Sequence, residues 1–229
     1  MRLIDRWVGI PLCFFASFWP LKKAQADSNS TLATNIPPPD TIVFIGIAEI
    51  GALVVAYPAI KETRKQHPKS RICFITAPAG LQTLELMGFE KEDIFLLETS
   101  SIKSLLKGIV NIRSHFKGGR VSAIVLEPFT RFSTLLSAWI GASKRIGCYR
   151  FLNEGVFLGN ILTHRLVYNP HLHISQTYFA LAKALIEPDS AKPLLKEYIP
   201  SQIKNRLKIN IPEKEQQTLM KRLQSECPE

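Results

Sequence analysis

The stretch Thr41-Ile-Val-Phe-Ile-Gly-Ile-Ala-Glu-Ile-Gly-Ala-Leu-Val-Val-Ala-Tyr-Pro-Ala-Ile60 decides the fold of this chain. Its first part, residues 42–47, is a short apolar run rich in β-branched residues, which is typical of a strand buried on both faces of a parallel sheet. Gly46 and Gly51 bracket the four residues after this run, and an apolar segment then leads into charged residues from Lys61 on. The order predicts strand, tight loop and helix, the first βα unit of an open α/β sheet.

The same alternation continues as far as Leu185. Further strands are predicted at residues 71–76, 93–97, 121–126 and 144–149, with a short one near Leu166 inside a long loop. Helices are predicted at residues 79–87, 100–116, 130–140 and 171–185, and a charged helix at 213–225. Single helices between strands at this spacing indicate βαβ units, so the expected fold is a Rossmann-like, doubly wound parallel sheet.

The chain divides into four parts. We expect an apolar N-terminal segment at 1–26, a polar, proline-ended linker at 27–40, one α/β domain at 41–187, and a proline-broken tail with a terminal helix at 188–229. The 229 residues are enough for one full domain with appendages.

The N-terminal segment contains thirteen residues without charge, Trp7 to Trp19. A helix of that length spans about 20 Å, less than the roughly 30 Å of a bilayer core. Tryptophan at both ends and cations on both flanks favour a helix that lies at a membrane interface. Two alternatives stay open: a secretory signal cleaved after Ala24-Gln25-Ala26, and a helix packed on the protein's own surface.

The net charge of +10 is unevenly placed. Between Thr99 and His173 there are ten Lys or Arg and two acids, Glu127 and Glu154, so this segment carries +8 (ten minus two). Such a field favours an anionic partner, whether nucleic acid, acidic lipid or phosphorylated sugar, and a solubilising surface is the plain alternative. Nucleic acid is the weakest of these because no interleaved aromatic and basic motif is present.

The four cysteines are scattered, with no C-x-x-C pair and no histidine at metal-ligand spacing. A zinc site or a disulfide framework is therefore not expected, and Cys73 and Cys148, inside apolar runs, should be small buried residues. The first loop also lacks the glycine patterns of dinucleotide-binding and P-loop sites, so no bound cofactor is expected.

Two loops at the carboxyl ends of predicted strands carry the candidate site, since ligands of open α/β sheets bind there. Glu49 is the only ionisable residue between Asp40 and Lys61, and it could act as a general base or cap the following helix. After the fourth strand, Thr130 and Ser133 could donate hydrogen bonds, and Arg131 could bind a carboxylate or phosphate. The alternative for this second loop is a helix cap at Thr130 beside a solvated Arg131.

Several segments resemble the heptosyltransferase-like glycosyltransferases of family nine, which have the GT-B fold. Tyr57-Pro-Ala-Ile60 is similar to a Leu-Pro-Ala-Leu-like segment of that family, and residues 145–151 are similar to its R-x-G-F-x-R-F. Residues 160–165 match L-T-H-R, and His171 with His173 match the H-x-H-I that opens a helix. The chain departs from the family at Gly46 and Ala52, where many members carry Lys and an Asp proposed as the acceptor base.

The resemblance implies the N-terminal, acceptor-binding half of a GT-B glycosyltransferase. It implies that Glu49 replaces the missing base and that the acceptor-binding residues are Thr130, Arg131, Ser133, Arg145, Arg150 and His173. The acceptor would be an anionic glycolipid of lipopolysaccharide or cell-surface glycan synthesis, at the cytoplasmic face of the inner membrane with peripheral membrane contact. A nucleotide-sugar donor, with ADP-heptose as one candidate, would bind a separate C-terminal domain, and no metal is needed.

A second hypothesis is a non-catalytic domain that binds a glycolipid or a protein partner, derived from a truncated or degenerate relative. The alanine at position 52 and the absence of a second α/β pattern after Leu185 favour it.

Overall fold

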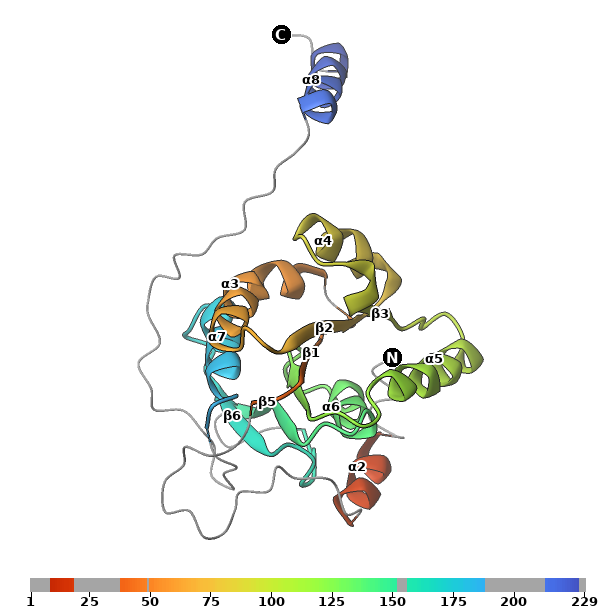
Figure 1. The fold of residues 1–229 in the computed structure, drawn as a ribbon, viewed down its shortest axis with the longest axis vertical. Coiled ribbons are helices and arrows are strands. Elements are labelled where there is room, and N and C mark those ends of the chain that lie inside the picture. Colours follow the sequence, from red (N-terminus) through yellow and green to blue (C-terminus); the bar gives the residue numbers. More distant parts are fainter. Residues whose placement is uncertain (1–8, 19–37, 49, 152–155, 188–212, 227–229) are drawn as a thin grey trace.

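The computed structural model describes residues 9–18, 38–48, 50–151, 156–187 and 213–226. Six strands form one sheet in the order β3-β2-β1-β4-β5-β6, and every neighbouring pair is parallel (Figure 1). The strands are β1 Thr41–Ile45, β2 Arg71–Thr76, β3 Ile94–Leu96, β4 Val121–Val125, β5 Lys144–Phe151 and β6 His164–Tyr168. The predicted Rossmann-like parallel sheet is confirmed.

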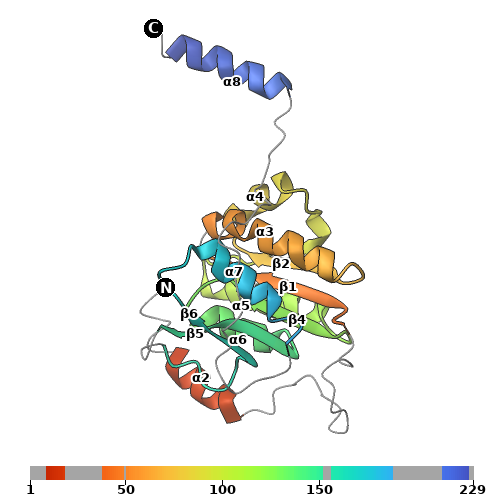
Figure 2. The ribbon, with the colours of Figure 1, turned by 90° about the vertical axis from the view of Figure 1, so that its left-hand side faces the viewer.

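The helices cover both faces of this sheet. The α-helices are α2 Gly9–Phe18, α3 Ile50–Gln66, α4 Leu81–Leu86, α5 Ile102–His115, α6 Arg131–Trp139, α7 Ile174–Lys183 and α8 Glu213–Glu226, with 3₁₀ turns at Pro78–Gly80 and Lys91–Asp93. Residues of α3, α4 and α7 pack on one face, around Phe44 and Phe74, while α5 and α6 pack on the other, around Val43 and Ile75 (Figures 1 and 2). The sheet is therefore doubly wound.

Strand β1 lies at the centre, as its apolar sequence predicts. Thr41 to Ile45 pair in register with Arg71 to Ile75 on one side and with Val121 to Val125 on the other. Residues 42–45 are fully buried because helices cover both faces of the sheet. A strand with no free edge and two covered faces has little tolerance for charge, which explains the uninterrupted apolar run.

Local signals in the sequence set several helix ends. Ser101 caps α5, its hydroxyl accepting a hydrogen bond from the backbone N–H of Ser104 at 3.1 Å. Gly88 and Gly141 follow α4 and α6 with φ of 82° and 80°, a left-handed conformation that glycine adopts at the end of a helix.

Helix α2 packs against α6, so the described part of the N-terminal segment lies on the protein's own surface (Figure 1). Cys13 is buried in this contact, and Ser17 Oγ accepts a hydrogen bond from the backbone N–H of Asn160 at 3.1 Å. Phe15 and Phe18 nevertheless remain largely exposed. Among the described helices, none is both long and apolar enough to cross a membrane. The predicted boundary of the segment at residue 26 and the linker at 27–37 lie outside the described residues.

The buried side chains of Lys144 and His164 hydrogen-bond the residues that follow α7, at the amino edge of the sheet. Lys144, the first residue of β5, donates from Nζ to the carbonyls of Leu185 and Glu187 at 2.8 and 2.9 Å. His164, the first residue of β6, hydrogen-bonds the Glu187 carbonyl through Nε2 at 2.9 Å. Carbonyls at a helix end need such donors when they are buried.

The cysteines of the sheet are buried, as predicted. Cys73 in β2 and Cys148 in β5 are buried, and burial raises the pKa of each thiol to about 12. A thiol that stays protonated at neutral pH is neither a good nucleophile nor a metal ligand.

Protonation of His67 should make the stability of the fold depend on pH. Burial and the positive charge of Lys144 lower its pKa below the ordinary 6.5, so the unfolded chain binds a proton that the folded one resists. Stability is therefore fully present above pH 6.5 and falls as the pH drops towards the folded-state pKa. His67→Leu should lose less unfolding free energy than the parent between pH 7.5 and 5.5 in urea titrations. His171→Gln, at an exposed histidine, is the control and should behave like the parent; equal losses in all three proteins would contradict the assignment.

Candidate functional site at the carboxyl edge of the sheet

The carboxyl ends of β1 and β4 form the switch point of this sheet. The chain runs outward from β1 to β2 and β3 on one side, and from β4 to β5 and β6 on the other. The two central strands remain paired to their last residues, since Leu126 N–H donates to the Ile45 carbonyl at 2.9 Å. Crevices at such points are where open α/β sheets bind ligands. The two loops predicted to carry the site therefore lie side by side.

Glu127 joins these two loops. It follows β4 directly, is buried, and accepts hydrogen bonds through Oε1 from the backbone N–H groups of Ile47, at 2.7 Å, and Ala48. Its Oε2 accepts the hydroxyl hydrogen of Ser133, in the first turn of α6. One carboxylate thus satisfies two backbone donors and one side-chain donor, and charged hydrogen bonds of this kind are the strong ones in proteins.

The turn after Glu127 is strained. Phe129 has φ of 62°, and it is the only residue other than glycine with positive φ in the part of the chain that the structure describes. Its ring packs edge-on against Tyr168, at the end of β6, with 5.6 Å between ring centroids. A left-handed conformation in an aromatic residue is costly and persists only where surrounding contacts impose it, most often at functional sites.

Of the residues predicted in this second loop, Thr130 is the most accessible. It is half-buried at the N-cap of α6, and its carbonyl rather than its hydroxyl binds the helix, by accepting from the Thr134 hydroxyl at 2.8 Å. Arg131 is only 7 % exposed, so the alternative of a solvated side chain does not hold; its Nε donates to the Phe157 carbonyl at 3.2 Å. Ser133 is fully buried under Glu127, and the structure gives it a supporting role in place of direct acceptor contact.

The two arginines predicted in β5 lie at opposite ends of the strand. Arg145 is 1 % exposed, and its guanidinium donates to the carbonyls of Ala142 and Ile161 near the amino edge. It is therefore not brought together with Arg131, and the structure gives it a structural role in place of acceptor binding. Arg150 pairs with Val167 near the carboxyl edge, and its side chain lies outside the described residues.

His173 stands at the N-terminus of α7, which follows β6 and so begins at the carboxyl edge. It is exposed, and its Nδ1 accepts a hydrogen bond from the backbone N–H of Ser175 at 3.2 Å. The backbone N–H of His173 in turn donates to Gln176 Oε1 at 3.0 Å. This is a capping box, so His173 is the N-cap residue of α7. The other imidazole nitrogen, Nε2, is not used by this cap.

Glu49 itself lies outside the described residues. Its neighbours Ala48 and Ile50 are exposed, and Ala48 is one of the two residues held by Glu127. A Cβ at Gly46 would come within 3.3 Å of Leu53 and 3.4 Å of Leu126, so it would fit tightly against the side chain of Leu53. Ala52 is buried in α3, where an unpaired carboxylate would be costly. The two departures from the glycosyltransferase pattern thus suit the local packing.

The site that emerges consists of two tied loops, the strained turn at Phe129, and the cap of α7. Glu127 is the residue that sequence reasoning missed, although its position directly after a buried strand was a usable signal. Across the described ranges, no group of three or more His, Cys, Asp or Glu side chains could hold a metal ion.

Comparison with known proteins shows the fold. Neither the protein-family models nor the curated proteins give a match to the sequence. Among solved structures, a glycosyl transferase of family 9 from Veillonella parvula matches with a TM-score of 0.56 and 17% identity, over 83% of this chain and 51% of that one. The E. coli ADP-heptose LPS heptosyltransferase II matches with a TM-score of 0.51 and 18% identity, over 80% of this chain and 50% of that one.

This chain therefore has the fold of about half of a family 9 glycosyltransferase, and it spans about half the length of these structures.

The link made by Glu127 can be tested in the first loop. In Glu127→Ala the amides of Ile47 and Ala48 lose their acceptor, at a cost of about 1.5–3 kcal/mol per charged hydrogen bond. Their hydrogen exchange should become about tenfold faster or more, while amides in the middle of β1 keep their protection. Glu98→Ala, at an exposed position in another loop, is the control. Unchanged exchange at Ile47 and Ala48 would show that the loop does not depend on this carboxylate.

Proposed function

We propose that this domain is the acceptor-binding half of a sugar transferase of the glycosyltransferase family 9 type. The observation that carries the proposal is the tie at the switch point, where Glu127 fixes the loop next to Glu49 against the loop that leads to Thr130 and Arg131. Fixed loops on both sides of such a crevice hold a ligand in one orientation, and orientation supplies much of the rate enhancement in group transfer. The fold likeness to family 9 structures supports the same class.

The proposed reaction is transfer of a sugar to an acceptor hydroxyl. The hydroxyl oxygen attacks the anomeric carbon of a nucleotide sugar, the bond from that carbon to the diphosphate oxygen breaks, and the nucleoside diphosphate leaves with the electron pair. The proton of the attacking hydroxyl passes to the carboxylate of Glu49, the only carboxylate in the loop after β1. Glu127 is assigned to holding the two loops, because it is buried and both of its oxygens accept hydrogen bonds from the protein.

The proposed acceptor is an anionic glycolipid of lipopolysaccharide or cell-surface glycan synthesis. Of the residues predicted to bind the acceptor, Thr130 and His173 are accessible in the described structure, and Arg150 lies near the carboxyl end of β5. Arg131 is buried and hydrogen-bonded to the Phe157 carbonyl, so it would attract the anionic acceptor through its charge without contacting it. The excess of +8 between Thr99 and His173 attracts such an acceptor.

The donor, with ADP-heptose as one candidate, would be held by a second domain, because the whole enzymes that share this fold are about twice as long. A non-catalytic glycolipid-binding domain is the second candidate function. It is favoured by Gly46 and Ala52, which stand where the glycosyltransferase pattern has a cation and a carboxylate; Gly46 is closely packed and Ala52 is buried.

We also propose peripheral contact with the cytoplasmic face of the inner membrane through α2. The helix is apolar throughout, and four of its large apolar side chains are about half exposed or more: Leu12, Phe14, Phe15 and Phe18. An amphipathic or apolar helix that cannot span the bilayer can lie in its interface.

Acceptor binding should depend on His173 separately from its capping role. Asparagine is an equally good N-cap residue, so His173→Asn should leave α7 and the stability of the fold unchanged while removing the imidazole. Calorimetric titration with a deacylated lipopolysaccharide core oligosaccharide should then show affinity reduced by about tenfold or more at low salt. A neutral oligosaccharide should bind weakly to both proteins. Equal affinity of parent and variant for the core oligosaccharide would remove His173 from the site.

Glu49→Gln separates binding from catalysis. It keeps the shape of the side chain but not its basicity, so core oligosaccharide should bind with unchanged affinity. Turnover, measured with a donor domain present, should fall by about 10²-fold or more if Glu49 is the general base. Full turnover would mean that a group other than Glu49 takes the proton.

Donor binding tests which half of the enzyme this is. Between β1 and α7 the carboxyl edge has no glycine-rich turn that could hold a diphosphate at a helix N-terminus. Titration with ADP-, GDP- and UDP-sugars should therefore show no tight binding to this chain. Micromolar affinity for any of them would mean that the domain is the donor-binding half.

A further inference from the structure

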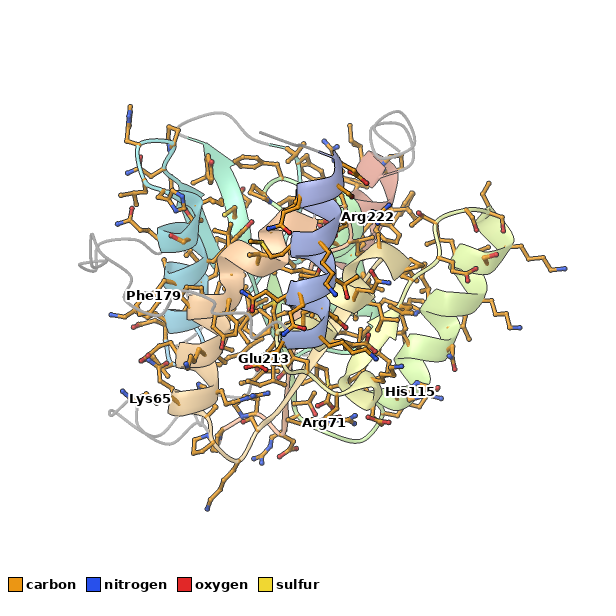
Figure 3. The ribbon with its side chains drawn as sticks, turned by 90° about the horizontal axis from the view of Figure 1, so that it is seen from above. Lys65, Arg71, His115, Phe179, Glu213 and Arg222 are labelled. Carbon is orange, nitrogen blue, oxygen red and sulfur yellow. The ribbon has the colours of Figure 1, made fainter. Side chains whose placement is uncertain are left out.

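Helix α5 carries an apolar stripe that the fold leaves uncovered. Ile102, Leu106 and Val110 are 72, 58 and 63 % exposed, and their spacing of four residues places them along one side of the helix. The side next to this stripe packs on the sheet through Ile112, with Leu105 and Ile109 beside it. The outer side of α5 points away from the body, and its side chains project into open space (Figure 3). The helix is thus apolar over an arc much wider than its contact with the core.

Cations border this stripe. Lys103, Lys107 and Arg113 are exposed on α5, and no acidic residue occurs from Thr99 to Leu126. At 100° per residue, Lys103 and Lys107 lie next to Val110, on the side of the stripe away from the core. Helix α5 therefore combines exposed apolar side chains with positive charge and has no acidic residue of its own.

A tryptophan extends the same surface onto the neighbouring helix. Trp139 of α6 is 43 % exposed, and its indole N–H donates to the carbonyl of Ile109 at 3.2 Å. The guanidinium of Arg113 lies over the indole, 4.6 Å from its centroid, and hydrogen-bonds the Trp139 carbonyl at 3.0 Å. A half-exposed tryptophan beside cations is the composition found at the boundary between water and lipid.

Helices α5 and α2 lie on the same side of the sheet. Helix α6 packs on the sheet face that α5 also covers, and α2 packs on α6 (Figure 1). Lys65 at the end of α3 and His115 at the end of α5 mark the two opposite sides of the body in Figure 3. Helices α2 and α5, which both carry exposed apolar side chains, therefore lie on the same side of the sheet.

We propose that α5, together with Trp139, is a docking surface for an anionic lipid bilayer, distinct from α2 and from the sugar site. Lying flat, α5 would bury Ile102, Leu106 and Val110 among the acyl chains while Lys103 and Lys107 contact lipid phosphates. A second copy of the chain fits this surface poorly, because a symmetric contact would bring Lys103, Lys107 and Arg113 against their own equivalents. The inference deepens the membrane contact proposed for α2, and it does not require sugar transfer.

The test is flotation of the full chain with vesicles of phosphatidylcholine, with and without phosphatidylglycerol. The parent should bind the anionic vesicles, and less so at high salt. Leu106→Ser/Val110→Ser and Lys103→Glu/Lys107→Glu alter only exposed side chains, so they should fold normally. The first should reduce binding by about tenfold, and the second by about thirtyfold or more, because each of its two cations contributes about 1 kcal/mol near an anionic surface. Phe15→Ser/Phe18→Ser, on α2, should weaken binding but leave its salt dependence in place.

Matched controls lie on the other face of the sheet. Leu86 of α4 is 61 % exposed, and Lys61 and Lys65 of α3 are exposed, so Leu86→Ser and Lys61→Glu/Lys65→Glu repeat the same chemical changes there. They should bind vesicles like the parent. The Leu106→Ser/Val110→Ser variant, which changes no charge, should keep the parent's affinity for core oligosaccharide, and this separates the inference from the sugar site.

Two outcomes would overturn the proposal. One is parent-like flotation of both α5 variants, which would leave the membrane contact to α2 alone. The other is a parent that light scattering shows to be dimeric and that Leu106→Ser/Val110→Ser makes monomeric without loss of flotation, which would assign the stripe to a second copy.

Discussion

The pairing of β1 with β2 on one side and β4 on the other is the constraint on which this structure depends. A strand hydrogen-bonded along both edges must carry helices on both faces, so the positions of α3 and α6 follow from it. The same pairing creates the switch point, where backbone N–H groups of the first loop lose their strand partners. Glu127 accepts hydrogen bonds from two of these N–H groups, and its carboxylate thereby takes the place of the missing strand partner.

Most of the fold could be predicted from the sequence because its strands are apolar runs separated by single helices. Residues 71–76 form the predicted strand without change, Ser101 caps the predicted helix, and even the short strand near Leu166 is present. Two features escaped prediction. The 3₁₀ turns at 78–80 and 91–93 carry no period of their own, and α7 begins only after His173 because the side chain at the cap, rather than the apolar pattern, determines where a helix starts.

The candidate site was predictable in its place but only partly in its residues. That both loops lie at carboxyl ends follows from parallel strands, whereas the adjacency of β1 and β4 depends on strand order, which a single sequence does not reveal. Ser133 and Arg145 are polar residues in suitable segments, yet both are buried and bonded within the protein. The bond from Glu127 to Ile47 joins residues eighty positions apart, so no local pattern could indicate it. Long-range contacts of this kind distinguish a residue that supports a site from one that touches a ligand.

The buried pair Lys144 and His164 also determines where the chain leaves the domain. Both residues open their strands, so the carbonyl of Glu187 that they hold lies at the amino edge, on the far side of the sheet from the loops at Glu127. A strand of five residues is roughly 16 Å long at about 3.3 Å per residue. Any later segment that contributes to the carboxyl edge must first travel back over that height.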